Sequence, residues 1–246
     1  MKLAVIGDPV SHSRSPEIHR RLLADEGIDG SYVAIRVPKE NTINVLRRMR
    51  LDGYTGCNVT TPLKEEAMVA CDVVDESVRT AEAVNTIFFG MKIYGTNTDG
   101  IGARSALESV LGESVSLHRI GILGTGAAAR AILGALRETD VYAFCWGRDP
   151  QKVVELCERF ECQIWPVGNP PEIVLSTLPP NSRPHEAIVA DLRKADVVMD
   201  ANYGERSTLE RILEREVVRG DLMLEAQARA SFDYWLAHLD RVSSDS

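Results

Sequence analysis

Short apolar runs alternate with amphipathic segments in the first half of this chain. Runs of strand length, rich in β-branched and aromatic residues, predict strands over residues 2–7, 32–37, 54–60, 84–89 and 92–96. Apolar residues at helical spacing, such as Ile43, Leu46 and Met49, predict helices over residues 16–26, 40–50 and 62–70. Ser15 is the expected N-cap of the first helix. This half therefore reads as βαβαβα with a closing hairpin.

The second half alternates strand and helix more regularly. Strands are expected near residues 120–123, 141–146, 172–177 and 197–201. Helices are expected over residues 99–111, 127–138, 150–160, 184–191, 207–216 and 224–239. Such alternation predicts a parallel sheet with right-handed crossovers, so the expected fold class is α/β.

A glycine turn joins the first strand of the second half to an alanine-rich helix. Strand, glycine turn and helix in this order are typical of a loop that binds a dinucleotide pyrophosphate. Gly124 permits the tight turn and Gly126 lets phosphates approach bare backbone, next to the free N–H groups of the helix start. The expected cofactor loop comprises Gly124, Thr125, Gly126, Ala127 and Ala128. The alternative is an ordinary strand-to-helix turn with small residues for packing.

Composition excludes several classes of partner. The chain has 246 residues, 44% of them hydrophobic, and a net charge of −8, which argues against a general nucleic-acid or anionic-membrane binder. The apolar runs are too short to span a membrane. Five cysteines without a C-x-x-C pair or zinc spacing indicate free thiols and no metal site. We expect a cytoplasmic protein, a monomer or homodimer, that binds a small molecule.

Polar side chains gather where the predicted strands of the first half end. They include Ser13, Ser15, Thr60, Lys64, Asn85 and Asp99. In an α/β sheet, ligands bind at the carboxyl ends of the strands. Hydroxyls, an amide, a lysine and an aspartate would suit a small polyhydroxylated acid. Each residue also has an ordinary alternative: a helix cap, a turn residue or a solvated surface charge.

These stretches, with others further along, resemble the successive motifs of the shikimate dehydrogenase family. The matching stretches are residues 5–16 with Ile18 and His19, 58–64, 83–86, 97–100 and 124–131, followed by Asp200, Tyr203, Thr208, Leu209, Gly220, Met223, Leu224, Gln227, Phe232 and Trp235. Their order and spacing hold across nearly the whole chain. Glu82 departs from the pattern, because the family commonly has glycine there.

The resemblance implies a reversible reduction of 3-dehydroshikimate to shikimate with NADPH. The family's catalytic pair corresponds to Lys64, which would pass a proton to or from the reacting oxygen, and Asp99, which would orient it. Its carboxylate-binding serines correspond to Ser13 and Ser15. Its other substrate-binding positions correspond to Thr60, Asn85, Tyr203 and Gln227.

The resemblance also implies two domains. If Gln227 reaches the substrate, the last helix packs on the first half of the chain. We therefore expect a substrate-binding domain of residues 1–98 with 220–246, and a Rossmann-type dinucleotide-binding domain of residues 99–219. Gly220 corresponds to a cofactor-binding position of the family.

Cofactor choice depends on the end of the second Rossmann strand. Folds that prefer NAD usually carry an acid about 20 residues past the glycines, whereas this chain has Gly147, Arg148 and Asp149. Arg148 could pair with the 2′-phosphate of NADP. Asp149, where the family has threonine, would repel that phosphate if it pointed inward. NADP is therefore the expected cofactor, with NAD still possible.

Two other functions remain open from the sequence. One is a quinate or quinate/shikimate dehydrogenase of the same fold, which Ser15 disfavours because that subgroup often has threonine there. The other is a non-catalytic sensor of shikimate-pathway metabolites, which has no need of Lys64 as a proton donor.

Overall fold

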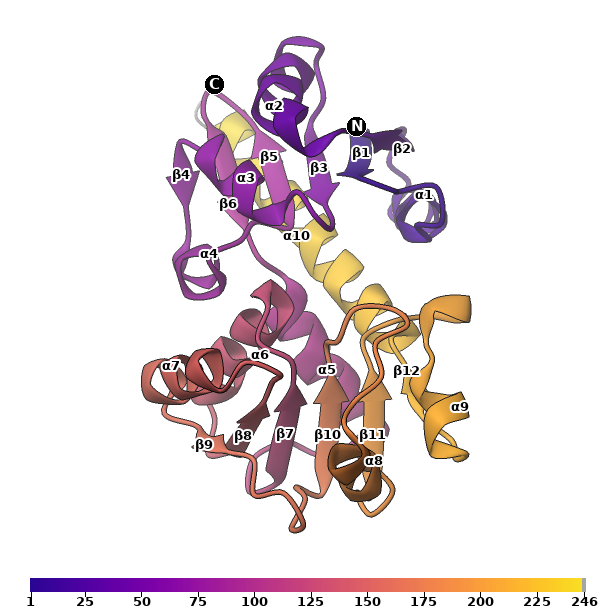
Figure 1. Cartoon of the computed structure of the whole chain (residues 1–246). Coiled ribbons are helices and arrows are strands. Elements are labelled where there is room, and N and C mark those ends of the chain that lie inside the picture. Colours follow the sequence, from indigo (N-terminus) through magenta and orange to yellow (C-terminus); the bar gives the residue numbers. More distant parts are fainter. Residues whose placement is uncertain (245–246) are drawn as a thin grey trace. The chain divides into compact units, whose positions relative to one another are not determined.

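The computed structural model describes residues 1–244 and divides into two compact units (Figure 1). Unit 1 consists of Met1–Gly102 and Glu225–Ser246, and unit 2 of Ala103–Leu224. The divisions fall inside two helices, α5 (Asp99–Leu111) and α10 (Asp221–Ser244). Each of these helices therefore supplies residues to both units.

Unit 1 is built on a mixed six-stranded sheet in the order β2-β1-β3-β5-β6-β4. Its strands are β1 (Lys2–Gly7), β2 (Ser31–Arg36), β3 (Gly56–Val59), β4 (Val73–Val74), β5 (Thr86–Phe89) and β6 (Ile93–Thr96). Its helices are α1 (Ser15–Asp25), η1 (Lys39–Asn41), α2 (Thr42–Leu51), α3 (Lys64–Val69) and α4 (Glu76–Ala81), together with parts of α5 and α10. β1 is parallel to β2 and β3, whereas β5 is antiparallel to both β3 and β6.

The two faces of this sheet bury different helices. Alternate β1 residues point to opposite faces: Ala4 packs in the cluster that includes α2 and α3, while Leu3 packs with α1 and α10. On the second face the Trp235 indole of α10 donates a hydrogen bond of 2.8 Å to the Ile87 carbonyl. Any side chain at Gly56 would collide with that indole, so the glycine lets α10 dock on β3.

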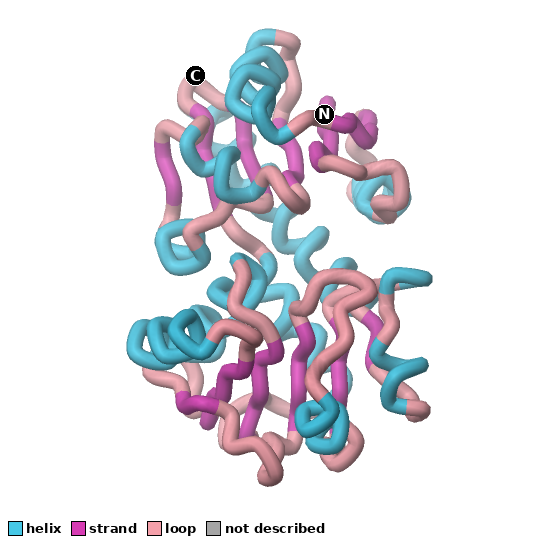
Figure 2. Tube along the Cα trace, viewed as in Figure 1, coloured by secondary structure: helices cyan, strands magenta, loops and turns pink. Residues whose placement is uncertain are grey.

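Unit 2 is built on a fully parallel six-stranded sheet in the order β12-β11-β10-β7-β8-β9. Figure 2 shows strands in magenta and helices in cyan. Its strands are β7 (Arg119–Leu123), β8 (Tyr142–Trp146), β9 (Gln163–Ile164), β10 (Ile173–Ser176), β11 (Val197–Asp200) and β12 (Val218–Arg219). Its other elements are α6 (Ala127–Arg137), α7 (Pro150–Phe160), α8 (Glu186–Leu192), η2 (Gly204–Arg206) and α9 (Leu209–Leu213), together with parts of α5 and α10. The predicted α/β fold class with a Rossmann-type parallel sheet is confirmed.

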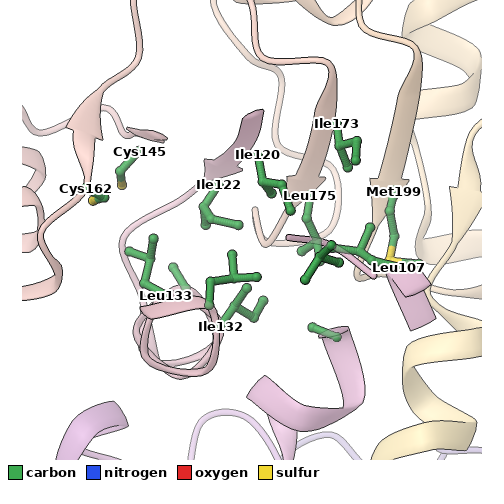
Figure 3. Packing of buried hydrophobic residues seen from close by; sticks show 14 of the residues in the cluster. Leu107, Ile120, Ile122, Ile132, Leu133, Cys145, Cys162, Ile173, Leu175 and Met199 are labelled. Atoms are coloured by element: carbon green, nitrogen blue, oxygen red, sulfur yellow. The ribbon is translucent and has the colours of Figure 1, made fainter. Parts of the chain in front are cut away.

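The core of unit 2 covers both faces of its sheet. On one face, Ile120 and Ile122 of β7 and Leu175 of β10 pack against Ile132 and Leu133 of α6 (Figure 3). On the other face, β10 and β11 pack against α8 and α9. Such near-continuous burial of strand residues is what a parallel sheet with helices on both faces requires.

Several local predictions were wrong. Helix α1 begins at Ser15 itself, with Arg14 at the N-cap position and no side-chain cap, so Ser15 is not an N-cap. The prediction also missed β4, α4, β9 and β12. The missed strands have two residues each, too few to produce a periodic pattern. The helix predicted over 207–216 shrinks to the five residues of α9.

Glu82 adopts the left-handed conformation, with φ 53°, directly after α4. This is the position at which the sequence departs from a glycine. Glycine is favoured in left-handed helix caps because it has no Cβ to clash with the backbone.

Candidate functional site

A buried ion pair lies at the centre of the polar cluster in unit 1. The Lys64 ammonium, at the start of α3, lies 2.5 Å from Oδ2 of Asp99, at the start of α5. The Asp99 side chain is 3% exposed and that of Lys64 is 18% exposed. The Lys64 side chain is therefore partly exposed while its counter-charge is buried. Neither residue has the ordinary role considered from sequence, because Asp99 bonds side chains rather than capping its helix, and Lys64 is not a free surface charge.

Asn85 fixes the other oxygen of this carboxylate. Its Nδ2 donates to Asp99 Oδ1 at 2.9 Å, and its Oδ1 accepts from the Thr98 backbone N–H at 2.9 Å. A backbone N–H can only donate and an ionised carboxylate can only accept, so the orientation of the amide is unambiguous. Asn85 thus holds Asp99 from the side opposite Lys64, and it is 4% exposed.

Gln227 reaches the same cluster from α10. Its Oε1 lies 3.4 Å from Nδ2 of Asn85. The close approach depends on Gly102 in α5, where an added Cβ would lie 2.7 Å from the Cβ of Gln227. The structure therefore brings together Lys64, Asn85, Asp99 and Gln227, which lie far apart in the sequence.

Ser13, Ser15 and Thr60 lie on the loops that follow β1 and β3. The Ser13 hydroxyl accepts a hydrogen bond of 3.3 Å from the Ser15 N–H, so the two serines form one local turn. A side chain at Gly7 would collide with that of Thr60, so this glycine lets the β3 loop close over the end of β1. In the described part of the chain, no hydrogen bond or ion pair joins these three residues to the side chains of Lys64 and Asp99.

The sequence did not single out the residues that support this cluster. Asn58, on β3, donates from Nδ2 to the Asn85 carbonyl at 3.2 Å and to Thr86 Oγ1 at 3.1 Å. The buried Ser231 hydroxyl lies 2.7 Å from that of Thr86 and donates to the Gln227 carbonyl at 2.9 Å. Ser231 stands one helical turn after Gln227, a spacing that could have revealed it. Asn58 lay within a recognised motif but had no assigned role.

A buried aromatic pair lies behind Asn58. The Tyr32 hydroxyl donates to Asn58 Oδ1 at 2.6 Å, and the His19 ring stacks on the Tyr32 ring at 4.4 Å. Burial lowers the pKa of His19 to about 3, although a side-chain hydrogen bond with Asn58 acts to raise it. Burial likewise raises the pKa of Tyr32 well above its usual value. Both side chains are therefore neutral at physiological pH.

In unit 2 the glycine loop joins β7 to α6. Gly124 has φ 129°, and any side chain there would collide with the Thr177 hydroxyl. Gly126 is the N-cap of α6 and provides no side-chain hydrogen bond, while an added Cβ there would meet no atom within 4 Å. The first N–H groups of α6, including those of Ala127 and Ala128, therefore receive no side-chain cap from Gly126, and the space beside Gly126 is open. Such a helix start suits a phosphate group.

The loop after β8 settles where Asp149 points. Asp149 is the N-cap of α7, and its Oδ1 accepts from the N–H of Gln151 at 3.1 Å and from that of Lys152 at 3.5 Å. The carboxylate is thus turned toward its own helix, the position that a threonine cap would occupy. Arg148 beside it is exposed. The expectation that Asp149 could repel a phosphate applied only to an inward-pointing side chain.

Tyr203 and Gly220 lie on the neighbouring loops of unit 2. The buried Asp200 accepts from the Asn202 N–H at 3.1 Å and from the Ser207 hydroxyl at 2.9 Å, which fixes the loop that carries Tyr203. Burial raises the pKa of Asp200 above its usual value, against these hydrogen bonds. A side chain at Gly220 would collide with the Ala201 carbonyl, so β12 can approach this loop only with glycine there.

Among residues 1–244, no group of three or more His, Cys, Asp or Glu side chains is arranged to hold a metal ion. No helix in this range has both the length and the apolar character needed to cross a membrane.

Comparison with known proteins gives consistent results. A family model described as the shikimate dehydrogenase substrate binding domain matches residues 5–87. The shikimate dehydrogenase (NADP(+)) of Aquifex aeolicus is 32% identical over 243 residues, covering 94% of this chain and 89% of the relative.

Solved structures extend the similarity to the whole fold. A crystal structure of shikimate dehydrogenase from Aquifex aeolicus has a TM-score of 0.84 at 29% identity and covers 96% of this chain and 92% of the other. A shikimate 5-dehydrogenase from Thermus thermophilus, in complex with NADP(H) and shikimate, has a TM-score of 0.84 at 29% identity, covering 96% and 93%.

Proposed function

Because the chain belongs to the shikimate dehydrogenase family, we propose that it interconverts 3-dehydroshikimate and shikimate with NADP(H). The observation that carries the proposal is the buried Lys64–Asp99 pair, with Asn85 fixed on the second carboxylate oxygen. A pure binding protein has no need of a lysine ammonium held against a buried carboxylate as a proton donor. The relatives named above supply the substrate and cofactor classes.

Reduction of a ketone requires a hydride at the carbonyl carbon and a proton at its oxygen. Bound NADPH supplies the hydride. Lys64 donates the proton to the oxygen and takes it back when the alcohol is oxidised. Asp99 holds the ammonium in place, and the Asn85 amide keeps Asp99 from rotating away.

We assign substrate binding to unit 1. Ser13 and Ser15 provide hydroxyl donors for the carboxylate, while Thr60, Asn85 and Gln227 provide hydroxyl and amide groups for the ring hydroxyls. Tyr203 belongs to unit 2, and its assignment to the same substrate comes from the family pattern alone. These roles agree with the chemistry of the groups, because each can donate a hydrogen bond to an oxygen-rich acid.

We assign cofactor binding to unit 2. The glycine loop from Gly124 to Gly126 and the uncapped first residues of α6, Ala127 and Ala128, together fit a pyrophosphate. Gly147, Arg148 and Gly220 complete the proposed contacts, with Arg148 on the 2′-phosphate. The capping role of Asp149 supports NADP, since its carboxylate is engaged by α7. We also propose a cytoplasmic location, which free thiols at all five cysteines support.

The test is the reduction direction with purified protein. Addition of 3-dehydroshikimate to protein and NADPH is expected to consume the nicotinamide absorbance and yield shikimate in equal amount. No consumption, while shikimate still raises the melting temperature, would favour the metabolite-sensor alternative. Consumption with 3-dehydroquinate at a higher rate would favour the quinate alternative.

A further inference from the structure

Tyr32 occupies an unusual place beside the proposed substrate site. It is fully buried on the edge strand β2, yet its hydroxyl donates to Asn58 Oδ1 at only 2.6 Å. None of the roles described above uses this hydroxyl. Apolar packing alone would be served equally well by phenylalanine, so the hydroxyl needs its own explanation.

On one side Tyr32 is attached to α1, the helix that begins at Ser15. The His19 ring lies parallel to the Tyr32 ring, with 5° between their planes. Nε and one terminal nitrogen of Arg20 donate to the Tyr32 carbonyl at 3.1 and 2.9 Å. Helix α1, which begins at Ser15, is therefore tied to Tyr32 by a ring contact and by hydrogen bonds to its backbone.

On the other side Tyr32 orients Asn58. The two ends of an amide have nearly the same size, so hydrogen bonds decide which way it faces. With its oxygen held by Tyr32, Asn58 directs Nδ2 to the Asn85 carbonyl and to Thr86 Oγ1. The Thr86 hydroxyl in turn donates to Asn85 Oδ1 at 2.9 Å.

The chain of contacts ends at the reactive groups. Asn85 Nδ2 binds Asp99 Oδ1, and Asp99 Oδ2 binds Lys64. Every link lies within unit 1 and within residues that are buried or partly buried. An unbroken hydrogen-bonded path thus runs from Tyr32 to the proposed proton donor. Tyr32 in turn packs on the helix that begins with the proposed carboxylate-binding Ser15.

We propose that Tyr32 is a positioning residue that couples the carboxylate-binding end of the site to the Lys64–Asp99 pair through Asn58 and Asn85. This inference rests on the proposed function. A ligand carboxylate bound at Ser15 fixes the position of α1. Because Tyr32 packs on α1, the position of this helix then determines how the Asn58 and Asn85 amides hold Asp99. Tyr32 touches no reacting atom, so its effect is on alignment rather than on proton transfer itself.

Tyr32→Phe tests the hydroxyl alone. The ring, its stacking on His19 and the backbone carbonyl for Arg20 all remain, so the variant keeps its packing. Asn58 loses one donor and its amide is less firmly oriented. We expect kcat with shikimate to fall about tenfold, as the loss of one buried hydrogen bond implies, with KM for shikimate and for NADP changed less than about twofold.

Two controls separate alignment from stability. Tyr234→Phe removes a partly buried hydroxyl from α10 in the same unit, outside the path, and should leave kcat unchanged. In an Asn58→Ala background, Tyr32→Phe should lower kcat no further, because Tyr32 acts through Asn58. If Tyr32→Phe fails to fold, Asn58→Asp tests the same path, since it replaces the amide that donates to Asn85, Thr86 and Ser231 by an acceptor of equal size.

The outcomes are distinct. Wild-type kcat in Tyr32→Phe, or a further loss in the Asn58→Ala background, would overturn the inference while the proposed function stands. A lower melting temperature without the split between kcat and KM would do the same, since it shows a packing role only. Absence of shikimate oxidation by the wild-type protein would overturn the proposed function and this inference with it.

Discussion

Replacing Lys64 tests the proposed chemistry most locally, because one side chain supplies both the proton and the counter-charge of Asp99. Lys64→Ala removes both. Lys64→Arg keeps a positive charge for Asp99 but offers a guanidinium that does not release its proton. Comparing the two variants separates the ion pair from proton transfer.

The expected magnitudes differ for turnover and for stability. Loss of a positioned general acid lowers kcat by about 10²- to 10⁴-fold. Leaving a buried carboxylate without its cation costs about 3–5 kcal/mol of folding free energy. We take the lower end, since Asp99 keeps its hydrogen bond from Asn85 and Lys64 is partly exposed. Lys64→Arg should recover most of that stability and little of the turnover.

The assay combines initial rates of NADPH formation with urea unfolding of each variant. Lys39→Ala is the matched control: Lys39 pairs with Glu66 at 2.7 Å in the same unit, but its side chain is 54% exposed. It should leave kcat unchanged and alter stability little. Shikimate should still raise the melting temperature of the folded Lys64 variants. Near-normal turnover in Lys64→Ala would refute the assignment of the proton donor, and full recovery in Lys64→Arg would reduce Lys64 to a counter-charge.

Three further predictions concern the cofactor, pH and one strained residue. Arg148→Ala should raise KM for NADP about 10- to 100-fold, because a charge-assisted hydrogen bond is lost, and should leave KM for NAD unchanged. Equal changes for both cofactors would contradict the assignment of Arg148 to the 2′-phosphate. His19 binds a proton near pH 6.5 when unfolded but only near pH 3 when folded, so its contribution to stability is complete above pH 6.5 and falls by about 1.4 kcal/mol per unit below it. Urea unfolding at pH 7 and pH 4.5 should therefore show a loss roughly 2.7 kcal/mol larger in the wild type than in His19→Phe, and equal losses would contradict a buried neutral His19. Glu82→Gly should be more stable than Glu82→Ala by about 1 kcal/mol, because only glycine adopts φ 53° without strain; thermal melts with no difference would contradict that conformation.

Much of the fold was predictable because its signals are local. The apolar runs of β7, β8 and β10 and the glycine turn before α6 follow from neighbouring residues alone. The resemblance to the shikimate dehydrogenase family is confirmed by the comparisons, since it rests on many motifs in order. Two-residue strands such as β9 were not predicted from the sequence, because their pairing is set by the sheet rather than by their own residues.

The support of the site could not be predicted in the same way. Tyr32 lies in an apolar run and resembles a core residue, and only the folded sheet places its hydroxyl on Asn58. The direction of Asp149 was also undecided from sequence, since an aspartate after a strand can face a ribose or cap the next helix. Such questions depend on three-dimensional contacts between distant segments, which residue type and spacing do not encode.

The most direct test of the central claim is an absorbance measurement with purified protein and four substrate pairs. Shikimate or quinate is mixed with NADP or NAD, and reduction of the nicotinamide is followed. We predict rapid reduction with shikimate and NADP and much slower reduction in the other three mixtures. Fastest reduction with quinate or with NAD would contradict the proposed substrate or cofactor, and no reduction in any mixture would contradict the assignment of an enzyme.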